Sequence, residues 1–120
     1  MTNATMLIDG YITAWNETDP ARRRDLIARI WTEDARYDDP MLSSRGHREI
    51  DAMTEAVQAK YPDHRFRRTG DVELHHDRAR FTWSLAPEDG PALVEGTDFA
   101  VITEGRLSAV TGFFDRAPAT

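Results

Sequence analysis

The chain changes its hydrophobic period once, near Pro62, and this change constrains the fold more than any other feature of the sequence. Before Pro62, apolar residues recur every three or four positions, which is typical of helices with one buried face. After it, apolar and polar residues alternate, which is typical of strands in a half-buried sheet. Helices followed by consecutive strands predict an α+β domain in which the helices cover one face of a sheet.

Three helices are predicted before the change of period. The first spans residues 4–18 and carries its apolar residues on one face. The second spans about 20–31, where Asp19 is a favoured N-cap and Pro20 a favoured first helical residue. The third spans about 47–60 and ends before Pro62.

Four strands are predicted after it, joined as an antiparallel meander. They lie at about residues 66–76, 81–85, 93–103 and 106–115. Glu104 and Gly105 predict a tight hairpin turn between the last two strands. A brief extended segment at 35–40 and a loop at 41–46 are predicted between the second and third helices. The sheet has to curl around the helices, because one of its faces needs cover.

Length and composition limit the possible functions. A chain of 120 residues forms a single domain, residues 1–120. Its 21 acidic and 15 basic residues give a net charge of −6, which argues against a nucleic-acid or anionic-membrane partner. The lack of cysteine excludes disulfides, thiol nucleophiles and thiolate metal sites. No apolar run is long enough to span a membrane and no secretory signal pattern is present, so we expect a cytoplasmic protein. The run Arg22-Arg23-Arg24 is predicted to form a solvated helix face.

Three local patterns, together with the order of elements, resemble those of a known family. They are Tyr11-x-x-Ala14-Trp15-Asn16-x-x-Asp19, then Trp31-x-x-Asp34-x-x-Tyr37-x-Asp39-Pro40, and Gly96-Thr97-Asp98-Phe99 followed by Glu104-Gly105-Arg106-Leu107 and Phe113-Phe114-Asp115. Over residues 5–116 the chain resembles a nuclear transport factor 2-like domain of the SnoaL-like polyketide cyclase and ketosteroid isomerase branch. The resemblance implies a cone-shaped α+β barrel: three N-terminal helices packed in a strongly curved antiparallel or mixed sheet, around a deep apolar pocket.

The resemblance also implies a function and three catalytic positions. It implies a cofactor-independent isomerase or cyclase, with lyase or hydrolase activity as further options, that abstracts a proton next to a carbonyl of an apolar ketone or polyketide-like molecule. The base position of the ketosteroid isomerases falls on Asp39, and their oxyanion-hole positions fall on Tyr11 and Asp98. Such a reaction needs a carboxylate base and donors directed at the oxygen that gains charge. Asp98 can donate only when protonated, a form that burial favours.

Each catalytic candidate also has a purely structural interpretation. Tyr11 is compatible with a core residue whose hydroxyl bonds the backbone. Asp39, before Pro40, is compatible with a turn cap. Asp98 is compatible with an ion pair to Arg80 across the sheet, or with a solvent-facing position, since a slip of one residue reverses its direction.

A small hydrophobic molecule is the expected ligand. Its predicted contacts are Trp15, Trp31, Tyr37, Met53, Val57, Trp83 and Phe113, although some of these are equally compatible with core positions. No metal site is predicted, because the adjacent His75 and His76 would point to opposite faces of a strand. A homodimer is expected from the resemblance, since sheet-face pairing is common in the family. Two other functions stay open: a non-catalytic module that binds a hydrophobic ligand, and a dimerisation scaffold whose own side chains fill the pocket.

Overall fold

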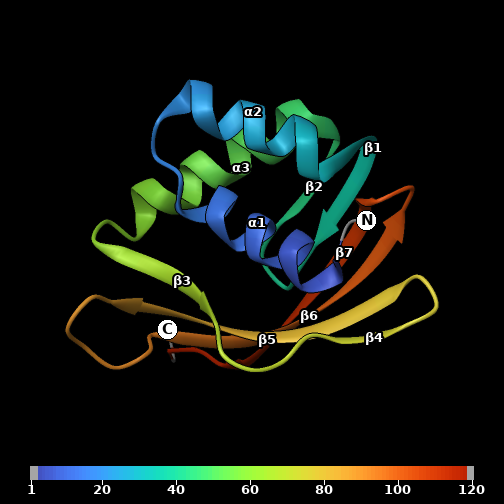
Figure 1. Cartoon of the computed structure of the whole chain (residues 1–120). Helices are drawn as coiled ribbons and strands as arrows, with labels where there is room; N and C mark the ends of the chain where they lie inside the picture. The colour runs from blue at the N-terminus through green and yellow to red at the C-terminus, as the bar shows by residue number, and fades with distance from the viewer. Residues whose placement is uncertain (1–2, 119–120) are drawn as a thin grey trace.

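Three helices lie on one side of a curved sheet in the computed structural model, which describes residues 3–118 (Figure 1). The helices are α1 (Ala4–Asn16), α2 (Pro20–Ile30) and α3 (Gly46–Lys60). The strands are β1 (Trp31–Asp38), β2 (Ser43–Arg45), β3 (His64–Arg68), β4 (Glu73–His75), β5 (Arg78–Pro87), β6 (Val94–Thr103) and β7 (Arg106–Arg116). Within the described residues, no helix is both long and apolar enough to cross a membrane.

The seven strands form one mixed sheet. Its order is β2-β1-β7-β6-β5-β3, and β4 pairs with the remaining length of β5. Strand β1 runs parallel to β7, whereas every other pairing is antiparallel. A strand from the helical half of the chain thus lies beside the last strand of the meander. The predicted α+β cone with a curved antiparallel or mixed sheet is confirmed.

Local signals set the helix boundaries. The side chain of Asn3 accepts from the backbone N–H of Thr5 at 2.7 Å, and that of Asp19 accepts from Arg22 at 2.9 Å. Each bond satisfies an N–H that the first helical turn leaves without a partner. Pro20 opens α2, as predicted, because its missing N–H costs nothing there.

The predicted strand at residues 66–76 is wrong as a single element. The structure divides it into β3 and β4, which pair with the two ends of β5. Gly70 and Asp71 lie in the gap between them, and both residue types are disfavoured in strands. The loop predicted at 41–46 contains the short strand β2, which pairs with β1. The extended segment predicted at 35–40 is longer than expected, because β1 begins directly where α2 ends.

The predicted solvated arginine face is wrong for its central residue. Arg22 and Arg24 are exposed, but only 1% of the Arg23 surface is exposed. Its guanidinium contacts Asp51 at 2.6 Å and Glu55 at 3.3 Å, so it links α2 to α3. A buried guanidinium requires partners of this kind, because an unpaired charge is costly to desolvate.

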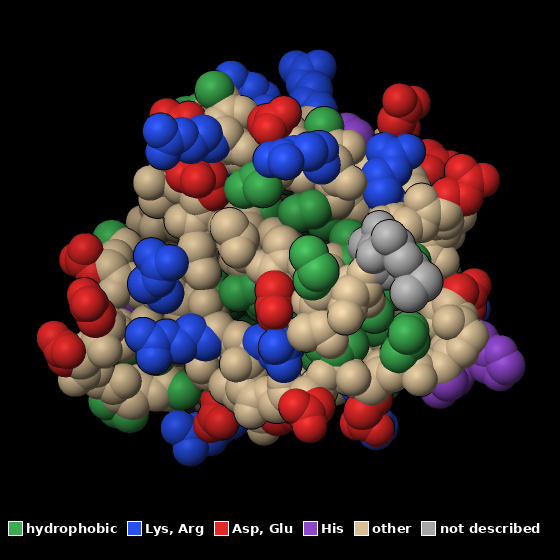
Figure 2. All heavy atoms as spheres, viewed as in Figure 1, with side chains coloured by type: hydrophobic (Ala, Val, Ile, Leu, Met, Phe, Trp, Pro, Cys, Tyr) green, Lys and Arg blue, Asp and Glu red, His purple; other side chains and the backbone are tan. Residues whose placement is uncertain are grey.

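Charged side chains of both signs are interspersed over the face of the molecule in Figure 2, with apolar side chains visible between them. The helices bury their apolar faces against the concave side of the sheet. On the opposite side of the sheet, Phe99 and Phe113 are 43% and 52% exposed, and their rings pack edge to face. The concave side holds the candidate site.

Candidate functional site

An open cavity of about 440 Å³ lies between the helices and the concave face of the sheet. Its walls are mostly apolar and aromatic, as in sites for small organic molecules. The lining residues come from α1, α3 and the residue after it, the segment after β1, strands β1, β3, β5, β6 and β7, and the chain after β7. The scaffold hypothesis required a pocket filled by the protein's own side chains. The cavity is open instead, so this requirement is not met.

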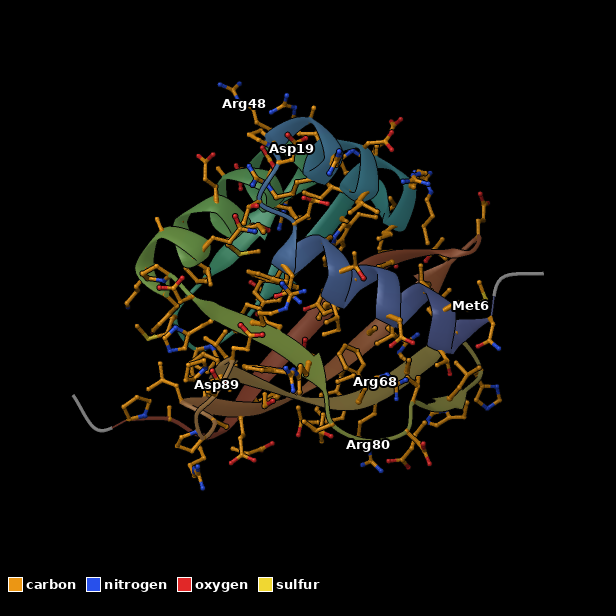
Figure 3. All side chains as sticks on the ribbon, turned by 60° about the vertical axis from the view of Figure 1, so that its left-hand side comes forward. Met6, Asp19, Arg48, Arg68, Arg80 and Asp89 are labelled. Carbon is orange, nitrogen blue, oxygen red and sulfur yellow. The ribbon has the colours of Figure 1, made fainter. Side chains whose placement is uncertain are left out.

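Asp98 is a buried carboxyl in the wall of this cavity. It points inward from β6 with 2% of its surface exposed. The Tyr11 hydroxyl donates to its Oδ2 at 2.7 Å, and the Trp83 indole N–H donates to its Oδ1 at 2.8 Å. The alternatives of an Arg80 ion pair or a solvent-facing position are wrong: Arg80 bonds Glu73 and points away from the helices (Figure 3).

Burial raises the pKa of Asp98 to about 6. The hydrogen bonds from Tyr11 and Trp83 oppose this rise, because they stabilise the anion, whereas the negative charge of Asp39 adds to it. Burial, followed by the charge of Asp98, holds the pKa of the Tyr11 hydroxyl well above its ordinary value. At neutral pH, Tyr11 thus stays a donor while Asp98 titrates just below neutrality.

Asp39 caps the turn after β1 and also lines the cavity. Its Oδ1 accepts from the backbone N–H groups of Met41 and Leu42, each at 2.8 Å. Its Oδ2 accepts from the Tyr37 hydroxyl at 2.6 Å. The structural interpretation of Asp39 as a turn cap is therefore correct, and the same carboxylate fixes Tyr37 in the wall beside Asp98. Burial first, and then the charges of Asp98 and Asp39, raise the pKa of Tyr37.

Gly112 leaves space for the two acidic groups. It is paired with Asp98 in the sheet. A Cβ at this position would lie 2.8 Å from Oδ1 of Asp98, 3.4 Å from Cβ of Asp39 and 3.5 Å from the Tyr37 hydroxyl. Asp39, Asp98 and Tyr37 thus all lie next to one glycine on β7.

Gly96 makes a comparable space for Trp83. A Cβ on Gly96 would lie 2.3 Å from the Trp83 ring, so the indole rests directly on the strand. The two residues are paired between β5 and β6, and Asp98 follows two positions along β6 on the same face. The glycine therefore allows the indole N–H to reach the carboxyl.

The structure places four of the seven predicted ligand contacts in the cavity wall and three elsewhere. Trp15, Tyr37, Val57 and Trp83 line the cavity. Trp31 and Met53 are buried in the core outside it: Trp31 packs against Tyr11, and the Met53 sulfur accepts from the Ser44 hydroxyl. Phe113 lies on the outer face of the sheet. These three positions are corrections to the predicted site.

Phe114 lines the cavity in place of Phe113. Adjacent strand residues point to opposite faces, so only one of two neighbouring phenylalanines can point inward. The pairing of Asp98 with Gly112 decides which one, because it fixes the phase of β7. The sequence alone shows that neighbouring strand residues point to opposite faces, but not which of them points into the cavity.

Other lining residues were not predicted, and they are mainly Phe66, Tyr61, Lys60, Met41 and Leu42. Phe66 is held by Asn16, whose side-chain amide donates to its carbonyl at 2.9 Å and accepts from its N–H at 2.8 Å. The sequence offers one signal for this contact, because the polar Asn16 comes directly after the apolar face of the first helix.

The arrangement can carry out proton transfer on a bound organic molecule. It offers carboxyls in two environments: Asp98 is buried among aromatic rings, and Asp39 is bonded to backbone N–H groups. It also offers the hydroxyls of Tyr11 and Tyr37 beside them. A carboxylate with a pKa near neutrality and adjacent donors are the groups that general base catalysis needs.

The curved mixed sheet, its three helices and the polar cluster within an apolar cavity define an α+β cone of the nuclear transport factor 2-like class. The chain belongs to the SnoaL-like family, whose domain model matches residues 8–110. A candidate isomerase of this family from Agrobacterium tumefaciens str. C58 is 40% identical, with a TM-score of 0.90 over 97% of this chain and 100% of that one.

More distant structures share the fold. A candidate ketosteroid isomerase from Kribbella flavida DSM 17836 is 22% identical, with a TM-score of 0.71 over 97% of this chain and 80% of that one. A candidate SnoaL-like polyketide cyclase from Jannaschia sp. CCS1 is 17% identical, with a TM-score of 0.69 over 92% and 86% of the two chains. None of the curated proteins matches this chain.

Proposed function

We propose that the protein is a cofactor-independent isomerase or cyclase that removes a proton next to a carbonyl of an apolar ketone or polyketide-like substrate. One observation carries the proposal: the buried Asp98 carboxyl, bonded by Tyr11 and Trp83, in the wall of an open apolar cavity. The similarity to SnoaL-like and ketosteroid isomerase-like proteins supports this class of reaction.

The hydrogen bonds favour Asp98 as the proton acceptor. Both of its donors stabilise the anion, and a pKa of about 6 leaves it mostly ionised at neutral pH but still basic enough to accept a proton. Asp39 already accepts three hydrogen bonds, which fit a carboxylate that holds Tyr37. This assignment differs from the roles that the sequence resemblance implies, in which Asp39 is the base and Asp98 belongs to the oxyanion hole.

After the transfer, Asp98 is neutral and no longer competes for the Tyr11 proton. The phenol can then donate to the enolate oxygen, where the negative charge now lies. The proton leaves carbon for the Asp98 carboxylate and returns from it to a different carbon, in an isomerisation, or to the cyclised product. Atoms and charge balance without a further reactant.

Exchange of carbon-bound protons for deuterium tests the proposal. Aryl and alicyclic ketones are incubated with the wild type, Asp98→Asn and Asp39→Asn in D₂O and followed by proton NMR. We expect exchange with the wild type, a loss of about 100-fold or more in Asp98→Asn, and a smaller loss in Asp39→Asn. A loss confined to Asp39→Asn would restore Asp39 as the base, and equal rates in all three proteins would contradict catalysis by either carboxyl.

Binding without turnover is the second candidate function. It is favoured by the apolar wall of the cavity and by the structural use of Asp39 in its turn. Trp15 and Trp83 line the cavity, so a bound ligand would change the tryptophan fluorescence. Saturable binding of ketones with no deuterium exchange would favour this function over the enzyme.

We also propose a cytoplasmic homodimer that pairs through the outer face of the sheet. Phe99 and Phe113 are large apolar side chains exposed there, and burying them would be favourable. Sedimentation velocity of the wild type and Phe113→Glu is the test. A dimer that dissociates in the variant is expected, and a wild-type monomer would contradict the proposal.

A further inference from the structure

We infer that the substrate carries an anionic group at one end, which Lys60 and Tyr61 bind at the mouth of the cavity while the carbonyl lies beside Asp98. This inference rests on the proposed function and specifies its substrate class as an apolar ketone with a terminal carboxylate or phosphate. Two observations carry it: the positions of the charged residues along the cavity wall, and the lack of ion-pair and hydrogen-bond partners for the side chains of Lys60 and Tyr61 among the described residues.

Among the residues that the structure describes, one cationic side chain lies in the wall of the cavity. Its charged lining residues are Asp39, Asp98 and Lys60. Lys60 is exposed at the C-terminal end of α3, whereas Asp98 is almost fully buried. The cation therefore lies at the mouth of the cavity and the carboxyl lies in its interior. The charges that shift the pKa of Asp98 include Asp39 but not Lys60, which fits a separation of the cation from the acidic cluster.

The Lys60 ammonium lies over the Tyr61 ring, 5.5 Å from its centroid. This contact directs the ammonium toward a residue that itself lines the cavity. Within residues 3–118, Lys60 forms no ion pair, although Arg23, Arg68 and Arg80 each do. In the same range, Tyr61 forms hydrogen bonds through its backbone only, and its hydroxyl has no partner. The mouth thus offers an ammonium and a phenol as donors to an anion.

Lys60 also has a structural role available, because a cation in the last turn of α3 interacts favourably with the helix dipole. An arginine would serve that role equally, and 14 of the 15 basic residues in the chain are arginine. The dipole alone therefore does not explain the lysine. Either cation supplies the positive charge that an anion requires, and the ammonium of lysine supplies it as a compact point charge.

Charge also sets the direction in which such a ligand enters. The carboxyls of Asp39 and Asp98 would repel an anionic group placed in the interior. A ligand with one anionic end and one ketone end is therefore bound in a single orientation, with its apolar body along the aromatic wall. This orientation presents the carbons next to the carbonyl to Asp98.

The test uses two probes that differ only in charge: 6-oxo-6-phenylhexanoate, an aryl ketone with a terminal carboxylate, and its primary amide. Affinities are measured by calorimetry for the wild type, Lys60→Ala, Lys60→Arg and Arg48→Ala, at low and high salt. Arg48 lies at the other end of α3 and points outward, so its replacement removes the same charge away from the cavity (Figure 3). Deuterium exchange next to the ketone is followed in the same samples.

We expect the wild type to bind the carboxylate about three- to fivefold more tightly than the amide, the range for an ion pair that water reaches. This preference should vanish in Lys60→Ala, persist in Lys60→Arg and Arg48→Ala, and decrease at high salt. Equal affinity for both probes, or a preference that survives in Lys60→Ala, would overturn the inference, whereas exchange of both ketones would still support the proposed function. If neither probe binds, the inference fails, and the proposed function is then decided by deuterium exchange with the wider set of ketones.

Discussion

The hydroxyl of Tyr11 donates to Oδ2 of Asp98 at 2.7 Å, across 87 residues of sequence, and joins the first helix to the middle of the sheet. The bond places a hydroxyl that stays protonated beside a carboxyl whose pKa burial raises to about 6. The stability of the fold and the basicity of Asp98 therefore place opposite demands on this position. The same desolvation that makes Asp98 a useful base also makes its ionised form costly to the fold.

Proton abstraction by Asp98 predicts a rate that depends on pH. We expect the rate of deuterium exchange to increase with pH through an apparent pKa of about 6, because only the ionised carboxyl accepts a proton. In Asp98→Asn, the residual rate should show no step in this range. A wild-type profile without such a step would contradict the assignment.

The raised pKa also predicts an effect on stability. Below about pH 4, Asp98 is protonated in both the folded and unfolded states, so it adds no pH dependence. Between about pH 4 and 6, the unfolded state ionises while the folded state keeps its proton, and stability falls as pH rises. A shift from 3.8 to about 6 corresponds to a loss of about 3 kcal/mol, complete above pH 6.

Asp98→Asn removes this loss, since the amide does not ionise. The difference in unfolding free energy between Asp98→Asn and the wild type should therefore shift in favour of the variant between about pH 4 and 6. Urea denaturation at a series of pH values measures it, and other titrating groups cancel in the difference. A constant difference would mean that Asp98 is not desolvated in solution.

Trp83→Phe should raise the pKa of Asp98 further. The indole N–H is one of the two hydrogen bonds that stabilise the anion, and phenylalanine keeps the ring but not the donor. Carbon-13 NMR titration of labelled aspartate gives the pKa directly. Trp15→Phe is the matched control, because Trp15 lines the same cavity but makes no bond to Asp98. An equal shift in both variants would point to a general change in the cavity.

The three helices and the antiparallel meander of β5, β6 and β7 could be predicted because each depends on local signals. The Asp19–Pro20 pair begins α2, and Glu104 and Gly105 adopt the positive φ angles of 51° and 80° that a tight hairpin turn requires. The pairing of β1 with β7 could not be derived from such signals, because nothing in β1 specifies a parallel partner about 70 residues later. It entered only through the family resemblance, which allowed a mixed sheet.

The acidic residues of the candidate site could be predicted from the sequence, whereas the residues that line its walls were predicted less well. Asp98 stood out because a carboxyl is rare among strand residues of apolar character. Arg23 was missed because nothing in a run of three arginines marks the one that meets Asp51 from another helix. Which side of a strand or helix faces a cavity depends on contacts between distant segments.

Gly112→Ala should damage the site more than the fold. The added methyl would lie 2.8 Å from Oδ1 of Asp98, so this carboxyl must move, whereas its distance of 3.5 Å from the Tyr37 hydroxyl is an ordinary contact. We expect a destabilisation of about 1–3 kcal/mol, which is typical of overpacking, together with loss of deuterium exchange. Gly10→Ala is the control: its methyl meets the flexible end of Ile30 at 3.1 Å, and alanine is the better helix former. Exchange should persist in Gly10→Ala, and full exchange in Gly112→Ala would show that the reaction does not depend on how Asp98 is placed.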